Sequence, residues 1–323
     1  MVAISCIYAT VREDYSIKSN PNLHQFVPML KCFQRQTFKD FEIVLVDGLY
    51  EQRKNYVFPP DLKVKHVPHH PNHRLWLDLK YWAVCEAFNT GIIHSDGEQV
   101  IFMTDGIVFD AALLQNYHNW FQKGYFPLCG FRGIDHYNYP DFDIEVDWRG
   151  DLDSRLKWMV KHEVDTMLPA PREWFFGLSS VPLKAALEVN GYDERFDGCK
   201  GLEDMDMGIR LNMLYPAKFV LDRKMVIINL PVNMISHVKS GDFKHNYPLL
   251  ILNSEQHRAR VNCEKLSEAD VKYVYDRTIY EGTVIAPSGP NPLHPESAMF
   301  KFWLDHQPIF NLEQERKERI EHE

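Results

Sequence analysis

The largest group of acidic side chains in this sequence lies in the segment GYDERFDGCKGLEDMDMGIRL, residues 191–211, which holds six carboxylates and four glycines. A carboxylate crowded by others has a raised pKa, which suits it to remove a proton from a hydroxyl group. A simpler interpretation is a solvated loop that leads into a helix, because acids in the first helical turn interact favourably with the helix dipole. We expect the last of these acids, Asp206, to pair with Arg210 one helical turn later.

Two further acids follow apolar stretches that have the composition of buried strands. Asp47 follows FEIVLV, and Asp105 follows QVIFMT; each is succeeded by a glycine. Because the carboxyl ends of parallel strands meet at one edge of a sheet, we expect these two carboxylates to lie close together. An aspartate at such a position also commonly ends a strand in a turn.

The elements that must position these acids alternate between strands and helices. This alternation predicts an α/β fold with a mainly parallel sheet and helices on both faces, whose ligands bind at the carboxyl ends of the strands. The expected strands are residues 2–9, 41–46, 62–67 and 99–103, and the expected helices are residues 23–38, 77–93, 111–123, 247–261 and 268–280, with a charged helix at the end of the chain.

Composition narrows the class of protein. The formal net charge of −9 provides no overall basic field that would attract nucleic acid or anionic lipid. The six cysteines form no Cys-x-x-Cys pair, which makes zinc improbable and favours reduced thiols in the cytoplasm. No apolar run approaches the roughly eighteen residues of a membrane span. A dinucleotide-dependent dehydrogenase is disfavoured, because the first predicted strand is not followed by a Gly-x-Gly-x-x-Gly turn.

Several segments, in order, carry a more specific signal. The first predicted strand runs into ATVR, a predicted helix ends in CFQRQT, and FEIVLVDG follows; AFNTGIIHSDGEQVIFMTDG and the acidic segment come later. Together they resemble family 2 of the nucleotide-sugar glycosyltransferases, over residues 1–240. The resemblance implies a GT-A (Rossmann-like) domain with a nucleotide-sugar-binding half at residues 1–110 and an acceptor half at residues 111–240. Residues 241–323 would form a C-terminal helical extension.

The resemblance also implies an activity, the transfer of a sugar from a nucleotide diphosphate donor to an acceptor hydroxyl with inversion at the anomeric carbon. The donor is expected to be UDP-linked. In the family, an aspartate of a Glu-Asp pair at the start of a helix removes the proton from that hydroxyl. Asp204 matches this general base, and Glu203 matches the residue that orients the acceptor.

The donor end of the site follows from the same resemblance. Thr10, Arg12, Asp47 and Asp105 match positions around the nucleotide sugar, and Asp105 with His237 would hold Mn²⁺ or Mg²⁺. The sequence departs from the family where Thr104-Asp105-Gly106 offers one acid in place of the usual two. One carboxylate can still hold such a cation together with phosphate oxygens and water.

Other features leave alternatives open. The aromatic residues 174–176 either stack on a sugar or belong to the core. The histidines of KHVPHHPNHR are expected in a loop at the edge of the sheet, because prolines interrupt them. The incomplete acidic motif also suits a nucleotide-sugar-binding protein without catalysis. A glycan is the favoured acceptor, and modified DNA bases rank below it because their phosphates would require a basic domain.

Overall fold

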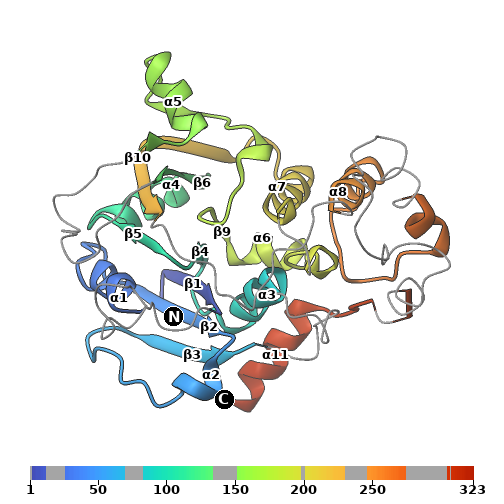
Figure 1. Ribbon diagram of the computed structural model, residues 1–323, viewed down its shortest axis with the longest axis horizontal. Helices are drawn as coiled ribbons and strands as arrows, with labels where there is room; N and C mark the ends of the chain where they lie inside the picture. The colour runs from blue at the N-terminus through green and yellow to red at the C-terminus, as the bar shows by residue number, and fades with distance from the viewer. Residues whose placement is uncertain are drawn as a thin grey trace, which may run out of the picture.

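The first sheet carries the beginning of the chain. The computed structural model describes residues 2–11, 26–69, 83–133, 151–197, 201–229, 246–273, 304–305 and 307–323. In this part of the chain, four parallel strands and one antiparallel edge strand form a sheet in the order β3-β2-β1-β4-β9 (Figure 1). The strands are β1 (Ile4–Thr10), β2 (Phe41–Asp47), β3 (Val64–Pro68), β4 (Gln99–Thr104) and β9 (Ser180–Pro182).

The register of this sheet aligns the strand ends that the sequence singles out. Thr10 lies opposite Asp47, and Ala9 lies opposite Thr104. The strand order also reverses at β1, since β2 and β3 lie on one side of it and β4 on the other. A crevice for ligands is expected where the order of parallel strands reverses, so the fold brings the predicted donor residues to such a place.

A second sheet lies beyond the end of β4 and has mixed strand directions. Its order is β5-β10-β6-β7, and β8 pairs with the start of β10. Its long central pair, β6 and β10, is parallel, with a register shift between Leu221 and Val226. The strands are β5 (Ile107–Phe109), β6 (Phe126–Gly133), β7 (Asp151–Leu152), β8 (Thr166–Met167) and β10 (Phe219–Asn229).

Helices surround both sheets (Figure 1). The α-helices are α1 (Phe26–Gln34), α2 (Tyr50–Arg53), α3 (Val84–His94), α4 (Leu113–Gln122), α5 (Ser154–Lys161), α6 (Leu183–Glu188), α7 (Glu203–Leu214), α8 (Asn246–Glu255) and α11 (Leu312–His322). Two 3₁₀ turns also lie in the acceptor half: η2 (Arg172–Trp174) and η3 (Glu194–Phe196). None of the helices in the described ranges combines the length and apolar character that a membrane span needs.

Strand β1 is buried on both faces, and its alternating side chains enter two different cores. Cys6 and Tyr8 join a cluster with α1 and α4, whereas Ile7 and Ala9 join a larger cluster with α3, α6 and α7. Successive side chains of a strand point to opposite faces, so one apolar run serves both clusters. This explains why the first strand reads as a continuous apolar run.

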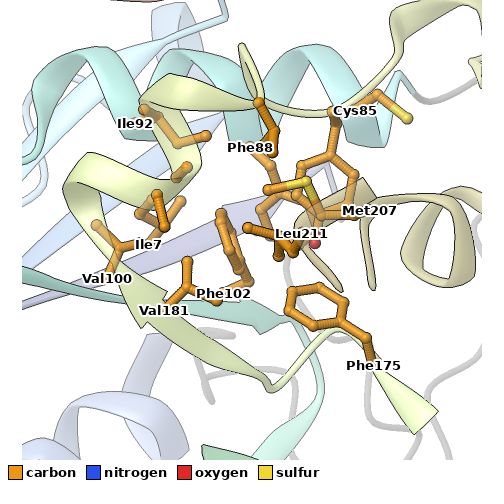
Figure 2. Close-up of a cluster of buried hydrophobic side chains, with 14 of the residues drawn as sticks. Ile7, Cys85, Phe88, Ile92, Val100, Phe102, Phe175, Val181, Met207 and Leu211 are labelled. Atoms are coloured by element: carbon orange, nitrogen blue, oxygen red, sulfur yellow. The ribbon is translucent and has the colours of Figure 1, made fainter. Parts of the chain in front are cut away.

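The larger core also packs Phe175 and helix α7 against the first sheet. Phe102 of β4 packs edge-on against Phe88 of α3, with ring centroids 5.3 Å apart, and also contacts the ring of Phe175 (Figure 2). Met207 and Leu211 of α7 enter the same cluster. Burial of such side chains stabilises the fold by about 1.5–3 kcal/mol each. The start of α7 is therefore held at a defined place above the end of β4.

The end of the chain returns to the first sheet. Helix α11 lies along α3, where the Arg319 guanidinium donates to an Asp96 oxygen at 2.9 Å and Arg316 donates to the Ser95 carbonyl at 3.0 Å (Figure 1). Helix α8 contacts α7 instead. The C-terminal segment thus touches both halves of the predicted domain, and the predicted boundary at residue 240 falls outside the described residues.

The expected α/β fold with a mainly parallel sheet is confirmed, while some element boundaries differ. The helix expected at residues 247–261 ends at Glu255, because His257 has a left-handed backbone with φ of 51°. His66, the first histidine of KHVPHHPNHR, lies in β3, as the strand expected at residues 62–67 predicts, and not in the loop expected for the histidine segment. Its Nε2 is 3.0 Å from an Asp47 oxygen.

Candidate active site

The strand ends of the first sheet and the acidic segment meet at Gly177. A Cβ atom placed on this glycine would lie 3.0 Å from Thr104 Cγ2 and 3.6 Å from Asp204 Oδ2. The glycine therefore lies between the end of β4 and the start of α7, and a side chain at this position would be in tight contact with Thr104. Thr104 and Asp204, which are a hundred positions apart in sequence, thereby lie on either side of one glycine.

Asp204 lies at this junction in the first turn of α7 and is partly exposed. Its Oδ2 accepts a hydrogen bond from the Gly177 N–H at 3.1 Å, and its Oδ1 accepts one from the Tyr192 hydroxyl at 3.3 Å. Partial burial and the charge of Glu203 raise the pKa of Asp204 well above its usual value. A reachable carboxylate of raised pKa has the properties of a general base.

The turn that carries Tyr192 is bound to α3 through one asparagine. Asn89 accepts from the Tyr192 N–H at 2.8 Å and donates to the Tyr192 carbonyl and to Glu194 Oε1, each at 2.9 Å. The preceding Gly191 has φ of +71°, and a Cβ there would lie 2.1 Å from Asn89 Oδ1. Only glycine fits this approach, so the glycine that opens the acidic segment has a structural reason.

Four of the six acids in the segment build the scaffold rather than the site surface. Each of them is buried and hydrogen-bonded to a defined partner. They are Asp193, bound to Arg195 at 2.6 Å; Glu194, bound to Asn89; Asp197, which accepts the Cys85 and Glu86 N–H groups at the start of α3; and Asp206, bound to Arg210 at 2.6 Å. The predicted Asp206–Arg210 pair is confirmed.

The scaffold acids are joined by Asn253 of α8, which the sequence did not single out. Its amide nitrogen donates to Asp193 Oδ2 at 3.0 Å and to Asp206 Oδ1 at 2.9 Å. Burial opposes ionisation of Asp193, but the charge of Arg195 outweighs it, so the pKa of Asp193 is lowered. Asp193 and Asp206 therefore have structural roles, since their oxygens bind buried side chains.

At the end of β1, the Thr10 hydroxyl donates to Asp105 Oδ2 at 3.2 Å. Asp105 is partly exposed, and it directly follows Thr104, which adjoins Gly177. Thr10 lies opposite Asp47 in the sheet, so this hydrogen bond joins the strand ends, while the predicted approach of the Asp47 and Asp105 carboxylates to each other stays a prediction. A ligand that reaches the Asp105 carboxylate lies at the junction with Asp204.

Asp47 has a different environment, since its side chain is fully buried. Its Oδ1 accepts from the Leu49 N–H at 2.8 Å and from Arg53 Nη1 at 3.1 Å, and its Oδ2 is bound to His66. The His66 ring in turn meets the ring of Tyr50, 4.8 Å away. Asp47 thus organises the loop and strand beside the crevice.

Known proteins of solved structure share the fold of this chain, although no protein-family model and no curated protein sequence matches it. S. aureus TarS in complex with UDP-GlcNAc superimposes with a TM-score of 0.54 at 12% identity, over 99% of this chain and 83% of that chain. GalNAc-T7 with UDP, GalNAc and Mn²⁺ gives 0.50 at 15% identity, over 98% of this chain and 56% of that chain.

The chain has the GT-A fold. This confirms the fold that the resemblance implied, a mixed α/β domain with a mostly parallel central sheet and flanking helices.

Two of the predicted residues of this GT-A site lie outside the described residues: Arg12 and His237. Within the described ranges, no three His, Cys, Asp or Glu side chains form a group that could hold a metal ion. Asp110, the next acid after Asp105, accepts from the Ala112 N–H at 2.9 Å at the start of α4.

The aromatic residues before Gly177 divide between core and surface. Phe175 is 2% exposed and belongs to the core, whereas Phe176 is 37% exposed. The ring of Phe176 stacks on Phe131 of β6, and Arg155 of α5 lies over both rings. Neither Phe131 nor Arg155 carries a sequence signal, because their neighbourhood is created by the second sheet.

Proposed function

We propose that this protein is a glycosyltransferase that moves a sugar from a nucleotide diphosphate sugar, most naturally a UDP-sugar, to an acceptor hydroxyl. The observation that carries the proposal is the junction at Gly177. It brings the donor end of the crevice, at Thr104 and Asp105, next to the carboxylate of Asp204. Inverting transfer needs the departing diphosphate on one side of the reacting carbon and the attacking hydroxyl, with its base, on the other, and the closeness of Thr104 to Asp204 supports such an arrangement.

The donor end would use the residues at the strand termini. Thr10 and Asp105 are linked by a hydrogen bond at the crevice, and Asp47 holds His66 and Tyr50 beside it. In this proposal the nucleoside lies against the Asp47 side and the diphosphate lies near Asp105. Asp105 is a suitable oxygen ligand for Mn²⁺ or Mg²⁺, and such a cation would stabilise the negative charge of the departing diphosphate.

The acceptor end would use the first turn of α7. Asp204 takes the proton from the acceptor hydroxyl as that oxygen attacks the anomeric carbon, and the bond to the diphosphate breaks. The raised pKa of Asp204 increases its affinity for that proton. Glu203, the preceding residue on α7, is proposed to orient the acceptor. Attack from the side of Asp204, with the diphosphate on the other side, would invert the anomeric configuration.

The solved structures of the same fold support the choice of donor. TarS was crystallised with UDP-GlcNAc, and GalNAc-T7 with UDP, GalNAc and Mn²⁺. Their low identity to this chain leaves the transferred sugar to be determined by experiment.

The test is to measure UDP binding by calorimetry with and without Mn²⁺, and to measure UDP release from a panel of UDP-sugars. We expect micromolar to millimolar UDP affinity, as is ordinary for enzyme substrates, and turnover of at least one donor. A protein without UDP affinity would contradict the proposal. Tight UDP binding without release from any UDP-sugar, with water or hydroxyl acceptors present, would favour the alternative of a nucleotide-sugar-binding protein without catalysis.

A further inference from the structure

A stacked pair of aromatic rings, of which Phe176 is exposed and Phe131 is partly buried, lies next in sequence to the glycine that binds the proposed base. Phe176 and Phe131, which we call the aromatic platform, have ring centroids 5.6 Å apart and planes inclined by 29°. Phe176 is 37% exposed, although aromatic side chains of this size gain most of their stabilisation from burial. An exposed ring that is held in a fixed orientation is a binding surface for another flat apolar face.

The platform is connected to the base through the backbone of Gly177. Phe176 directly precedes Gly177, whose N–H donates to Asp204. The backbone around Phe176 is fixed as well, since its N–H donates to Ser179 Oγ at 3.0 Å and its carbonyl accepts from the Ser179 N–H at 2.8 Å. Phe176 is therefore fixed one residue from the backbone group that holds Asp204.

Arg155 supports the platform and is already occupied. Its guanidinium carbon lies 5.9 Å from the Phe131 centroid and 5.7 Å from the Phe176 centroid. The side chain donates to both oxygens of Asp153 and to the carbonyls of Cys129 and Trp174, which uses four of the five N–H groups of an arginine. Asp153 also neutralises its charge. Arg155 therefore orients the rings and has little capacity left for a phosphate group.

We propose that the platform is an acceptor subsite for a neutral carbohydrate ring, which stacks its C–H face on Phe176 and presents a hydroxyl to Asp204. The inference rests on the proposed function, because it names the acceptor class of the same site. An acyclic polyol lacks a flat face to stack, and the Arg155 guanidinium beside the platform is engaged by Asp153 rather than open to a phosphate. The main support for this subsite is the Phe176 ring, which is exposed and held in one orientation by Phe131. Phe176 directly precedes Gly177, the backbone donor to Asp204.

The test is ligand-observed NMR titration of the full chain with methyl glucopyranoside, methyl galactopyranoside and ribitol, each with and without UDP. We expect at least one pyranoside to bind more tightly than ribitol. In Phe176→Ala its dissociation constant should rise about three- to tenfold, as the loss of one stacking contact implies, while Phe176→Tyr should retain binding. Trp158→Ala is the matched control, because Trp158 is a 42% exposed aromatic residue on α5 outside the platform.

Several results would overturn the subsite. They are equal binding of ribitol and the pyranosides, no pyranoside binding in either condition, or unchanged pyranoside binding in Phe176→Ala. Circular dichroism of each variant separates loss of binding from loss of fold. Failure of the broader proposal is distinguishable, since it would appear as absent UDP affinity in calorimetry, whereas the pyranoside titrations without UDP read the platform alone.

Discussion

Two kinds of carboxylate lie within one short segment, and their surroundings differ. Asp193 and its partner Arg195 are both buried, and the lowered pKa of Asp193 keeps it ionised. Asp204, eleven positions later, is partly exposed, accepts hydrogen bonds from a neutral N–H and a hydroxyl, and has a raised pKa. The same functional group thus serves as scaffold in one place and as a candidate base in the other.

The difference shows what makes a carboxylate available for proton transfer. A bidentate guanidinium stabilises the anion and removes its tendency to accept a proton, whereas neutral donors hold the carboxylate in place without neutralising it. The scaffold acids fix the helix start that presents Asp204. Substitutions in the two sets should therefore have opposite signatures, one in stability and one in turnover.

The largest effect on stability is expected for Asp193→Asn. It leaves the guanidinium of Arg195 buried without a compensating charge, which typically costs about 3–5 kcal/mol. Urea unfolding of the variant and the wild type measures this loss. A change below about 1 kcal/mol, within the range of exposed ion pairs, would break the distinction between scaffold and site.

Gly177→Ala should separate the two halves of the site while leaving the scaffold pairs intact. The new methyl group would lie 3.0 Å from Thr104 Cγ2, so the Thr104 side chain or the backbone that binds Asp204 must shift by a few tenths of an ångström. We expect turnover of UDP-sugar to fall about tenfold, because small misplacements of reacting groups are costly. Unchanged turnover would remove the junction from the proposal.

Tyr192→Phe tests the neutral donors of the base. Removing the hydroxyl deletes a hydrogen bond that favours the anion of Asp204, so its already raised pKa should rise further. Glu203 and Arg155 remain the charges that act on it, and the Gly177 N–H remains its other donor. Because the base must be ionised, the acidic limb of the rate profile should move to higher pH by about half to one unit.

The control for that shift is Tyr215→Phe, because the Tyr215 hydroxyl donates to Glu188 rather than to Asp204. Its rate profile should coincide with that of the wild type. A profile for Tyr192→Phe that moves to lower pH, or does not move, would contradict the role of the hydroxyl.

The smallest effect is expected at a half-exposed scaffold acid, Asp96. Partial burial opposes its ionisation, but hydrogen bonds from Lys65 and Arg319 outweigh it and lower its pKa to about 2. The stabilisation is therefore complete above the unfolded pKa near 4 and is lost as the pH falls toward 2. Asp96→Asn should destabilise the protein by about 1 kcal/mol at pH 7, after allowance for solvent screening.

Glu51→Gln is the control for Asp96, because the Glu51–Lys54 pair is exposed on both sides. It should leave the unfolding midpoint unchanged. An equal loss of stability in both variants would show that the contact of α11 with Asp96 adds nothing beyond a surface pair.

The sequence was sufficient for features that depend on local pattern. Apolar runs predicted the strands, and the short-range pairing of Asp206 with Arg210 follows from helical spacing. Asp105 at a strand end is close to Thr10 because parallel strands align their termini. These features need only one element, or two elements in register.

Local sequence patterns did not predict the contacts between segments that are distant in sequence. Nothing in the sequence near Asp197 indicates that it binds the first amides of α3, and Asn253 has no signal that it bridges Asp193 and Asp206. The stacking of Phe176 on Phe131 depends on how the second sheet approaches the first. Tertiary packing decides each of these, so the site surface was less predictable than the sheet beneath it.

The most direct test of the proposed function is UDP-sugar turnover by Asp204→Asn, measured beside its UDP affinity and its unfolding midpoint. We expect turnover to fall about 10²- to 10⁴-fold, as for loss of a general base, with UDP affinity within about twofold and stability within about 1 kcal/mol, as for a substitution outside the buried scaffold. Turnover at the wild-type rate in the folded, UDP-binding variant would contradict Asp204 as the base.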